Sequence, residues 1–165
     1  MYIRIVRKGD FQQAKYYLAN GTFSRVLNLV KLWASFHVSR IAKKPFTWGM
    51  PASISIEPTT ACNLGCPECP SGLKKFTRPT GNLKPDLLGK LLDETKSTVQ
   101  YATFYFQGEP FLHPEFLELI REAHKQNIYT ATSTNAHFLT NDMAKKTVES
   151  GLDRLIISID GTTQE

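Results

Sequence analysis

The chain has 165 residues, 41% of them hydrophobic and 21% charged, which is the composition of one ordinary globular domain with its own core. It contains no apolar run of about eighteen residues, which excludes a transmembrane helix, and its start lacks the apolar stretch of a signal peptide, so we expect a cytoplasmic protein. The net charge of +5 is unevenly distributed: residues 1–50 carry nine Lys or Arg against one acid, whereas residues 51–165 carry eleven basic and fourteen acidic residues. Any attraction to phosphate groups therefore belongs to the N-terminal segment.

The sequence pattern changes near residue 50. In residues 23–44 apolar side chains recur every three or four positions, which predicts an amphipathic basic helix that Pro45 ends. We expect this helix to lie across the face or the bottom of the unit that follows. Contact with a membrane surface is the less favoured alternative, suggested by Trp33 and Phe36 among the Lys and Arg residues. No nucleic-acid-binding motif accompanies the charge, so no nucleic-acid partner is predicted. The sequence thus divides into a basic helical extension, residues 1–50, and a second unit, residues 51–165.

After residue 50, short β-rich segments alternate with helical segments. Strands are predicted over residues 53–57, 102–106, 129–134 and 155–159. Helices are predicted over residues 85–96, 114–125 and 140–150, the last capped by Thr140 and ended by Gly151. The side chains expected on the inner faces of the first two helices are Leu87, Leu88, Leu91, Leu92, Phe116, Leu117, Ile120 and Ala123. Alternating strands and helices indicate an α/β fold whose parallel strands curl into an arc.

The last predicted strand, residues 155–159, is strongly apolar and lies close to the end of the sequence. An apolar strand left at the edge of a sheet is a liability in a finished protein. We therefore expect the chain to be incomplete, with a missing part that continues the sheet.

All three cysteines, Cys62, Cys66 and Cys69, fall in one loop directly after the first predicted strand. Their odd number argues against a closed disulfide framework, and loops after strands carry the chemistry of βα-repeat folds. Three thiolates hold three irons of a four-iron cube and leave the fourth iron open to bind another group. A zinc site with His113 as a distant donor and a Cys66–Cys69 disulfide are the alternatives. The four histidines are expected to be structural or surface residues: His37, His113, His124 and His137.

Three further segments follow the later predicted strands. They are Gln107-Gly108-Glu109-Pro110, Thr134-Asn135 and Ser158-Ile159-Asp160-Gly161. Together with the C-x3-C-x2-C loop, these segments resemble the motifs of the radical S-adenosylmethionine (radical SAM) superfamily. They occur in the same order as in that family, and each follows a predicted strand. The resemblance covers about residues 52–163.

The resemblance implies a partial (β/α) TIM-like barrel of the radical SAM type, with about four βα units. It also implies that Cys62, Cys66 and Cys69 hold a [4Fe–4S] cluster whose open iron binds S-adenosyl-L-methionine. An electron from that cluster cleaves S-adenosylmethionine to methionine and a 5′-deoxyadenosyl radical, which abstracts hydrogen from a substrate. An electron donor such as flavodoxin or ferredoxin is expected. The other residues that the resemblance assigns to S-adenosylmethionine are Gln107, Gly108, Glu109, Pro110, Asn135, Ser158 and Asp160; Glu109 would receive the methionine amino group.

The sequence departs from the family pattern at two positions. Glu68 stands where relatives often have an aromatic residue near the adenine, and Gln107 replaces the first glycine of the second motif. The Cys-Pro-x-Cys-Pro loop is similar to the branch with a C-terminal SPASM domain, whose members modify peptides or proteins. The resemblance therefore predicts an oxidoreductase or modifying enzyme with a peptide or protein among its candidate substrates. A non-catalytic iron–sulfur binding fragment and a zinc-binding interaction module are the competing functions.

Overall fold

The computed structural model describes residues 8–159. Its elements in chain order are α1 (Lys8–Asn20), α2 (Phe23–Ala42), β1 (Ser53–Ser55), α3 (Pro85–Thr95), β2 (Tyr101–Thr103), the 3₁₀ helix η1 (Pro110–Leu112), α4 (Phe116–Lys125), β3 (Tyr129–Thr134), α5 (Asn141–Glu149) and β4 (Arg154–Ile157). Among the described helices, none combines the length and the apolar character that a membrane crossing requires.

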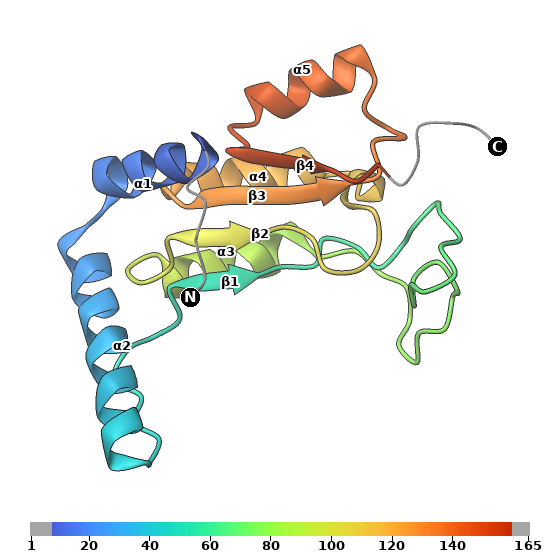
Figure 1. Cartoon of the computed structure of the whole chain (residues 1–165). Helices are drawn as coiled ribbons and strands as arrows, with labels where there is room; N and C mark the ends of the chain where they lie inside the picture. The colour runs from blue at the N-terminus through green and yellow to red at the C-terminus, as the bar shows by residue number, and fades with distance from the viewer. Residues whose placement is uncertain (1–7, 160–165) are drawn as a thin grey trace.

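The strands form one parallel sheet in the order β1-β2-β3-β4 (Figure 1). The register pairs Ser53 with Tyr101, Tyr101 with Tyr129, and Ala131 with Arg154. Helices α3, α4 and α5 follow β1, β2 and β3 in turn, so each helix returns the chain to the start of the next strand. The predicted α/β fold with parallel strands is confirmed.

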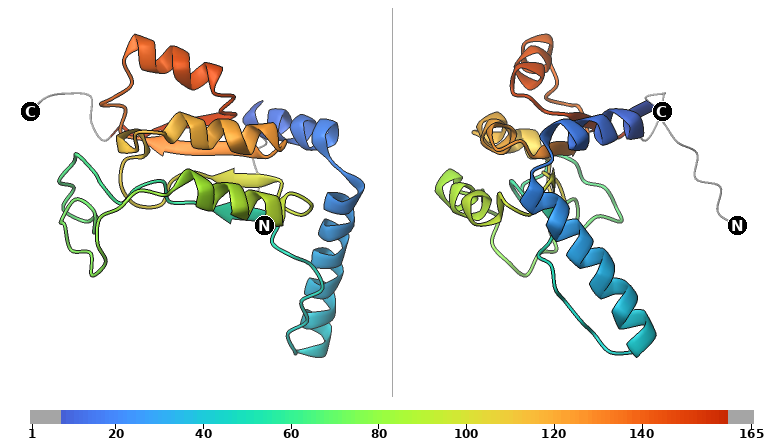
Figure 2. Two further views of the ribbon diagram at one scale, coloured as in Figure 1. Left: turned by 180° about the vertical axis from the view of Figure 1, so that it is seen from behind. Right: turned by 90° about the vertical axis from the view of Figure 1, so that its left-hand side faces the viewer.

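Helices α3 and α4 pack against one face of the sheet (Figure 2) and bury the core between them. In α3, Leu88 and Leu92 are buried, but Leu87 and Leu91 are 59% and 37% exposed, so the predicted apolar face was too wide. The core-facing residues of α4 are Phe116, Leu119, Ile120 and Ala123. Leu119 was not predicted, and Leu117 is only partly buried.

Three strands are shorter than predicted, although the N–H groups of Ile56, Phe104 and Ser158 still donate to carbonyls of the neighbouring strands. Strand β1 ends at Ser55, β2 at Thr103 and β4 at Ile157, whereas β3 spans the predicted residues 129–134. The cap of α5 is also as predicted, because the hydroxyl of Thr140 accepts a hydrogen bond of 3.3 Å from the backbone N–H of Met143. Beyond these bonds the chain turns into the loops that carry the site residues.

The N-terminal segment differs most from the prediction. The sequence pattern did not predict α1, which packs Tyr16 edge-on against Tyr129 at 5.3 Å between ring centroids. The predicted helix over residues 23–44 is present as α2, but its apolar side chains face outward, and its buried residues are Arg25, Asn28 and Ser35. The first turns of α2 lie against the loops that precede β2 and β3, where Arg25 donates to the carbonyls of Lys96 and Asn127. The rest of α2 projects away from the sheet (Figure 1), so only its first turns lie at the bottom of the body as expected.

Candidate functional site

The cysteine loop begins directly after β1 and is closed at its base by backbone pairing. Thr59 and Asn82 form an antiparallel bridge, and the N–H of Leu83 donates to the carbonyl of Pro58 at 2.8 Å. These bonds join the two ends of the segment that carries the cysteines. All three thiols are free and partly buried, so the disulfide alternative is not formed. The two ends of the loop are thus held together, and the cysteines lie in the part of the loop between them.

One pocket of about 210 Å³ collects residues that follow all four strands. Its lining residues are Cys62, Leu64, Cys66, Tyr105, Phe106, Gly108, Glu109, Ser133, Thr134, Asn135 and Ser158. The carboxyl ends of parallel strands meet at one edge of a sheet, which is why segments far apart in sequence converge there. The pocket therefore lies where parallel βα proteins carry their ligand sites.

Glu109 is the buried acid of this pocket, with 2% of its surface exposed. Its Oε1 accepts hydrogen bonds from the Thr134 hydroxyl at 2.6 Å and from the Phe111 N–H at 3.2 Å. Its Oε2 accepts one from the Asn135 N–H at 2.9 Å. A carboxylate offers about four acceptor positions, so one position on Oε2 is left for a further donor. The backbone N–H of Glu109 also donates to the carbonyl of Ala61 at 2.7 Å, which ties the end of β2 to the cysteine loop.

Two side-chain pairs join the neighbouring strand ends. The Asn135 amide donates to the Asn63 carbonyl oxygen at 2.9 Å, which links the end of β3 to the residue after Cys62. The hydroxyls of Ser133 and Ser158 lie 3.2 Å apart across β3 and β4. Both pairs fix the positions of polar groups along the pocket edge.

A second polar group lies behind Cys69. The Ser71 hydroxyl accepts a hydrogen bond from the Gly108 N–H at 3.0 Å and donates to Oε1 of Gln107 at 3.0 Å. The Cys69 Sγ lies 3.7 Å from the same Oε1. Hydrogen bonds from the backbone of Gly72, and with smaller effect from Ser71, lower the pKa of the Cys69 thiol, against the opposing effect of burial. This arrangement favours the thiolate that metal binding requires.

Two glycines allow the segments of the site to approach one another. Gly108 has φ +75°, and a Cβ there would lie 2.7 Å from the carbonyl oxygen of Ala61. A Cβ on Gly72 would lie 2.5 Å from the backbone nitrogen of Cys66. Gly108 thus supplies the close backbone contact even though Gln107 replaces the glycine before it.

The predicted site residues fall into three groups. Cys62, Cys66, Gly108, Glu109, Asn135 and Ser158 all line the pocket. Cys69, Gln107 and Pro110 do not line the pocket: the Cys69 Sγ lies 3.7 Å from Oε1 of Gln107, and Pro110 is buried at the start of η1. Asp160 lies outside the described residues.

Sequence reasoning missed several groups that build the site. Asn63, Ser71 and Ser133 were not singled out, and Thr134 was quoted only as part of a motif. His137 was expected to be structural or on the surface. Its Nδ1 lies 3.2 Å from Nδ2 of Asn63. Only the position of Asn63 between two cysteines could have signalled its place, because the other contacts depend on the fold.

The thiols of Cys62, Cys66 and Cys69 are the metal donors that the cysteine loop offers. Within residues 8–159, no three His, Cys, Asp or Glu side chains are grouped closely enough to hold one metal ion. His113 is not near such a group: it is buried, with its Nε2 2.8 Å from the carbonyl of Leu83. This placement of His113 leaves the zinc alternative without its fourth donor. The absence of a grouped set applies equally to Cys62, Cys66 and Cys69, whose thiols are not drawn together around one point in this structure. Three free thiols on one loop are the donors that an iron–sulfur cluster uses, so the residues present fit such a cluster by the type of their donor atoms.

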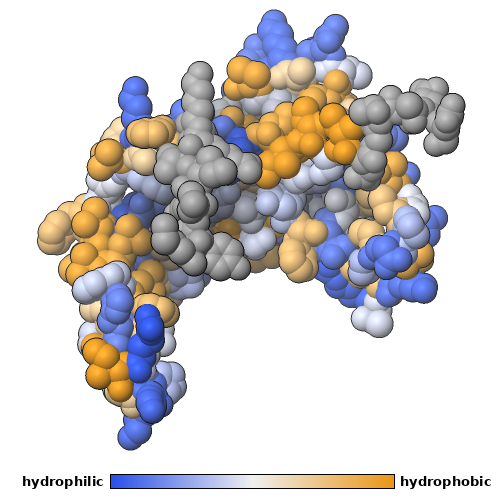
Figure 3. Space-filling view, viewed as in Figure 1, coloured by the Kyte–Doolittle hydropathy of each residue, from blue (hydrophilic) through white to orange (hydrophobic). Residues whose placement is uncertain are grey.

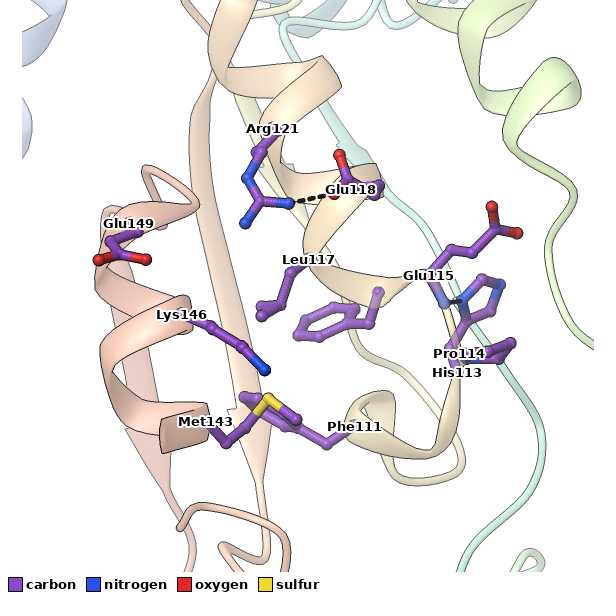
Figure 4. Close-up of a pocket in the computed structure, with 11 residues that line it drawn as sticks. Phe111, His113, Pro114, Glu115, Leu117, Glu118, Arg121, Met143, Lys146 and Glu149 are labelled. Atoms are coloured by element: carbon purple, nitrogen blue, oxygen red, sulfur yellow. Dashed lines mark hydrogen bonds and ion pairs between the residues drawn. The ribbon is translucent and has the colours of Figure 1, made fainter. Parts of the chain in front are cut away.

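A wider hollow of about 640 Å³ lies between α4 and α5, on the helical side of the molecule (Figure 4). Its two cations are already paired within their own helices: Arg121 with Glu118, and Lys146 with Asp142 at 2.7 Å. None of the predicted site residues lines it. We therefore assign the candidate site to the smaller pocket at the strand ends.

A parallel sheet with a cysteine loop after its first strand and a polar pocket along its carboxyl edge defines an α/β protein of the (β/α)-barrel class. Residues 56–165 match the model of the Radical SAM superfamily, and the chain belongs to this superfamily. Its members use S-adenosylmethionine and an iron–sulfur cluster.

Relatives of known name support the assignment. The chain is 34% identical over 107 residues to the tungsten-containing aldehyde ferredoxin oxidoreductase cofactor-modifying protein of Pyrococcus furiosus, covering 64% of this chain and 30% of the relative. It is 31% identical to the AdoMet-dependent heme synthase of Methanosarcina barkeri, with 70% and 33% covered. It is 29% identical to the PqqA peptide cyclase of Bradyrhizobium diazoefficiens, with 72% and 31% covered. The chain thus spans about a third of the length of the curated relatives it matches.

Solved structures show the same fold. BtrN in complex with AdoMet and 2-DOIA superposes with a TM-score of 0.59 at 24% identity, covering 68% of this chain and 48% of BtrN. Streptococcus suis SuiB bound to S-adenosylmethionine superposes with a TM-score of 0.51 at 22% identity, covering 86% of this chain and 31% of SuiB. The arc of four parallel strands is therefore part of a radical SAM barrel, as the sequence predicted.

Proposed function

We propose that the protein is a radical SAM enzyme whose cluster is held by Cys62, Cys66 and Cys69. The observation that carries this proposal is the single pocket that gathers two of the cysteines, the buried Glu109 and polar groups from all four strand ends. When bound, a [4Fe–4S] cluster supplies the electron that cleaves S-adenosylmethionine to methionine and a 5′-deoxyadenosyl radical, the species that abstracts hydrogen from the substrate. We assign residues 51–165 to the catalytic core and residues 1–50 to an extension.

Glu109 is the proposed receptor for the methionine ammonium group. Its remaining acceptor position lies on Oε2, beside the hydrogen bond from Asn135. A buried carboxylate binds an ammonium group more strongly than an exposed one, because water competes less. Thr134 and the backbone of Phe111 hold Oε1, so they orient the carboxylate rather than contact the ligand.

The other proposed contacts follow the pocket edge. Asn135 and Ser158 offer amide and hydroxyl groups, and Gly108 lines the same pocket where it lies close to the backbone of Ala61. Gln107 and Pro110 support this edge from behind. Asp160 is assigned to S-adenosylmethionine only by its place in the segment Ser158-Ile159-Asp160-Gly161.

The substrate class is proposed from the loop and the relatives together. The Cys-Pro-x-Cys-Pro loop is similar to the branch that modifies peptides or proteins, and one relative is named as a peptide cyclase. Other relatives are named for heme synthesis and cofactor modification. We propose a peptide or protein substrate and a small electron-transfer protein, flavodoxin or ferredoxin, as the donor.

The test is anaerobic reconstitution of the full-length protein with iron and sulfide. We expect about four irons per chain and the release of 5′-deoxyadenosine when S-adenosylmethionine and a reductant are added. Cys66→Ala should lose both signals, whereas Glu94→Gln, an exposed change on α3, should keep both. Uptake of one zinc without iron and sulfide would contradict the proposal. A stable cluster without 5′-deoxyadenosine release would instead support the non-catalytic binding function.

A further inference from the structure

Helix α2 presents its apolar side outward. Phe23, Val26, Val30, Trp33 and Ile41 are between 52% and 84% exposed. The residues that α2 buries are polar: Arg25, Asn28 and Ser35 are at most 5% exposed. Ordinary amphipathic helices of globular proteins face the other way, with the apolar side toward the core.

Hydrogen bonds on the inner side fix this orientation. The Arg25 guanidinium donates to the carbonyls of Lys96, Gln126 and Asn127 at 3.1, 2.9 and 2.8 Å. The Asn28 side chain donates to the Met50 carbonyl and accepts from the Met50 N–H, both at 2.8 Å. Turning the helix to bury its apolar side would break all of these bonds and leave a charged group unpaired.

The segment that continues from α2 adds to the same surface. The chain returns along the helix, and Phe46, Trp48 and Met50 are 40%, 51% and 60% exposed. Figure 3 shows the resulting apolar clusters along the projecting arm, with hydrophilic side chains gathered toward its tip. We call residues 23–50 the α2 arm.

The charge of the α2 arm has one sign. It contains five Lys or Arg and no Asp or Glu. Arg25 is buried, and the exposed cations are Lys31, Arg40, Lys43 and Lys44. The Arg40 guanidinium lies 5.7 Å from the Phe36 ring centroid, so this cation belongs to the apolar side itself. The surface therefore combines aromatic and aliphatic groups with uncompensated positive charge.

We propose that the α2 arm binds the surface of an anionic phospholipid membrane. A helix that lies in the membrane interface inserts Trp, Phe and aliphatic side chains among the acyl chains, while its Lys and Arg reach the phosphate groups. The four exposed cations complement anionic headgroups. A second copy of the arm fits poorly, because two such surfaces would bring cations together with no acid on either.

The shape of the arm also favours a lipid surface over a peptide. The exposed apolar side chains belong to a helix that projects from the body (Figure 2). A hollow beside it, lined by Leu27, Trp48 and Met50 among others, has a volume of only about 220 Å³, which is too small for the groove that a partner helix needs. The arm precedes β1 and lies beyond the amino ends of the strands, while the candidate pocket lies at their carboxyl ends. An arm on the membrane would thus leave the pocket open to substrate.

The test is cosedimentation of the full-length protein with vesicles, either pure phosphatidylcholine or an equal mixture of phosphatidylcholine and phosphatidylglycerol. We expect binding to the mixed vesicles, a blue shift of the tryptophan emission, and release at high salt. Lys43→Glu combined with Lys44→Glu, and separately Trp33→Glu combined with Phe36→Glu, should each weaken the partitioning about tenfold or more. Lys145→Glu and Val148→Glu, both exposed changes on α5, are the matched controls and should bind as the wild type does.

Other outcomes overturn the proposal. If wild-type protein ignores anionic vesicles and the Trp33/Phe36 variant melts at a lower temperature, another part of the full-length chain covers the arm. If the wild-type protein is an oligomer that does not bind vesicles, and the Trp33/Phe36 variant is a monomer, the arm joins copies of the protein. Equal binding to both vesicle types would show that the cations play no part.

Discussion

The hydroxyl of Thr134 donates a 2.6 Å hydrogen bond to the buried carboxylate of Glu109. The two residues lie 25 positions apart and meet because β2 and β3 are neighbours in a parallel sheet. The bond therefore ties two strand ends together through the acid that we propose for ligand binding. A carboxylate held in this way loses little freedom when a ligand arrives.

Glu109→Gln should separate the charge of this group from its shape. We expect the affinity for S-adenosylmethionine to fall about tenfold or more, because an amide cannot pair with an ammonium group as a carboxylate does. Equilibrium dialysis of the reconstituted full-length protein measures the change. Glu115→Gln, an exposed carboxylate at the start of α4, should leave the affinity unchanged. Unaltered binding by the Glu109 variant would exclude the proposed ammonium contact.

The glycines of the cysteine loop offer a matched pair of substitutions. Gly72→Ala would push a methyl group into the backbone of Cys66, where the nearest atoms are 2.5 and 2.7 Å away, whereas Gly65 has no atom within 4 Å. We expect Gly72→Ala to lose most of its iron and sulfide on reconstitution, and Gly65→Ala to match the wild type. Iron and sulfide assays on both variants decide this. Similar iron contents would show that the loop does not keep this packing when it binds the cluster.

Ser71 and Gln107 are predicted to adjust the electron affinity of the cluster through Cys69. As an iron ligand, Cys69 has no proton to donate, so the Gln107 amide would turn its NH₂ group to the sulfur. Hydrogen bonds to ligand sulfurs stabilise the reduced cluster. Gln107→Leu should therefore make the midpoint potential more negative at unchanged iron content, which a redox titration followed by electron paramagnetic resonance measures. A potential equal to that of the wild type would exclude this contact.

Asp153 stabilises the junction of β3 and β4. Its Oδ2 accepts hydrogen bonds from the backbone and hydroxyl of Thr130 at 2.8 and 3.1 Å, and Thr130 is fully buried. Asp153→Ala leaves the Thr130 N–H unpaired and should lower the free energy of unfolding by about 1–3 kcal/mol. Asp153→Asn keeps an acceptor and should lose less. Urea unfolding of the full-length protein compares the variants, and an equal loss in both would contradict the proposed role of the acceptor.

The same carboxyl group predicts a pH dependence. Burial raises the pKa of Asp153 above its ordinary value of 3.8, with the hydrogen bonds from Thr130 acting in the opposite direction. The folded chain therefore binds a proton at Asp153 more readily than the unfolded chain does. Stability relative to Asp153→Asn should increase as the pH falls through the raised pKa toward the unfolded value. A flat difference between the two proteins across this range would contradict the shift.

Features that depend on neighbouring residues could be predicted from the amino-acid sequence. The alternation of strands and helices, the full extent of β3 and the Thr140 cap all follow from side-chain patterns over a few residues. The motif residues were also found in sequence, because a cysteine spacing and short polar segments after strands can be read without knowing the fold.

The contacts between groups that lie far apart in sequence required the folded structure. Three hydrogen bonds of the site depend on strand order, which no local pattern specifies. They join Thr134 to Glu109, Asn135 to Asn63, and Gly108 to Ser71. The outward apolar side of α2 could not be predicted either, because periodicity defines two faces of a helix but not which one the protein buries. In this chain, Arg25 and Asn28 decide it, by bonding to backbone groups that the fold brings beside them.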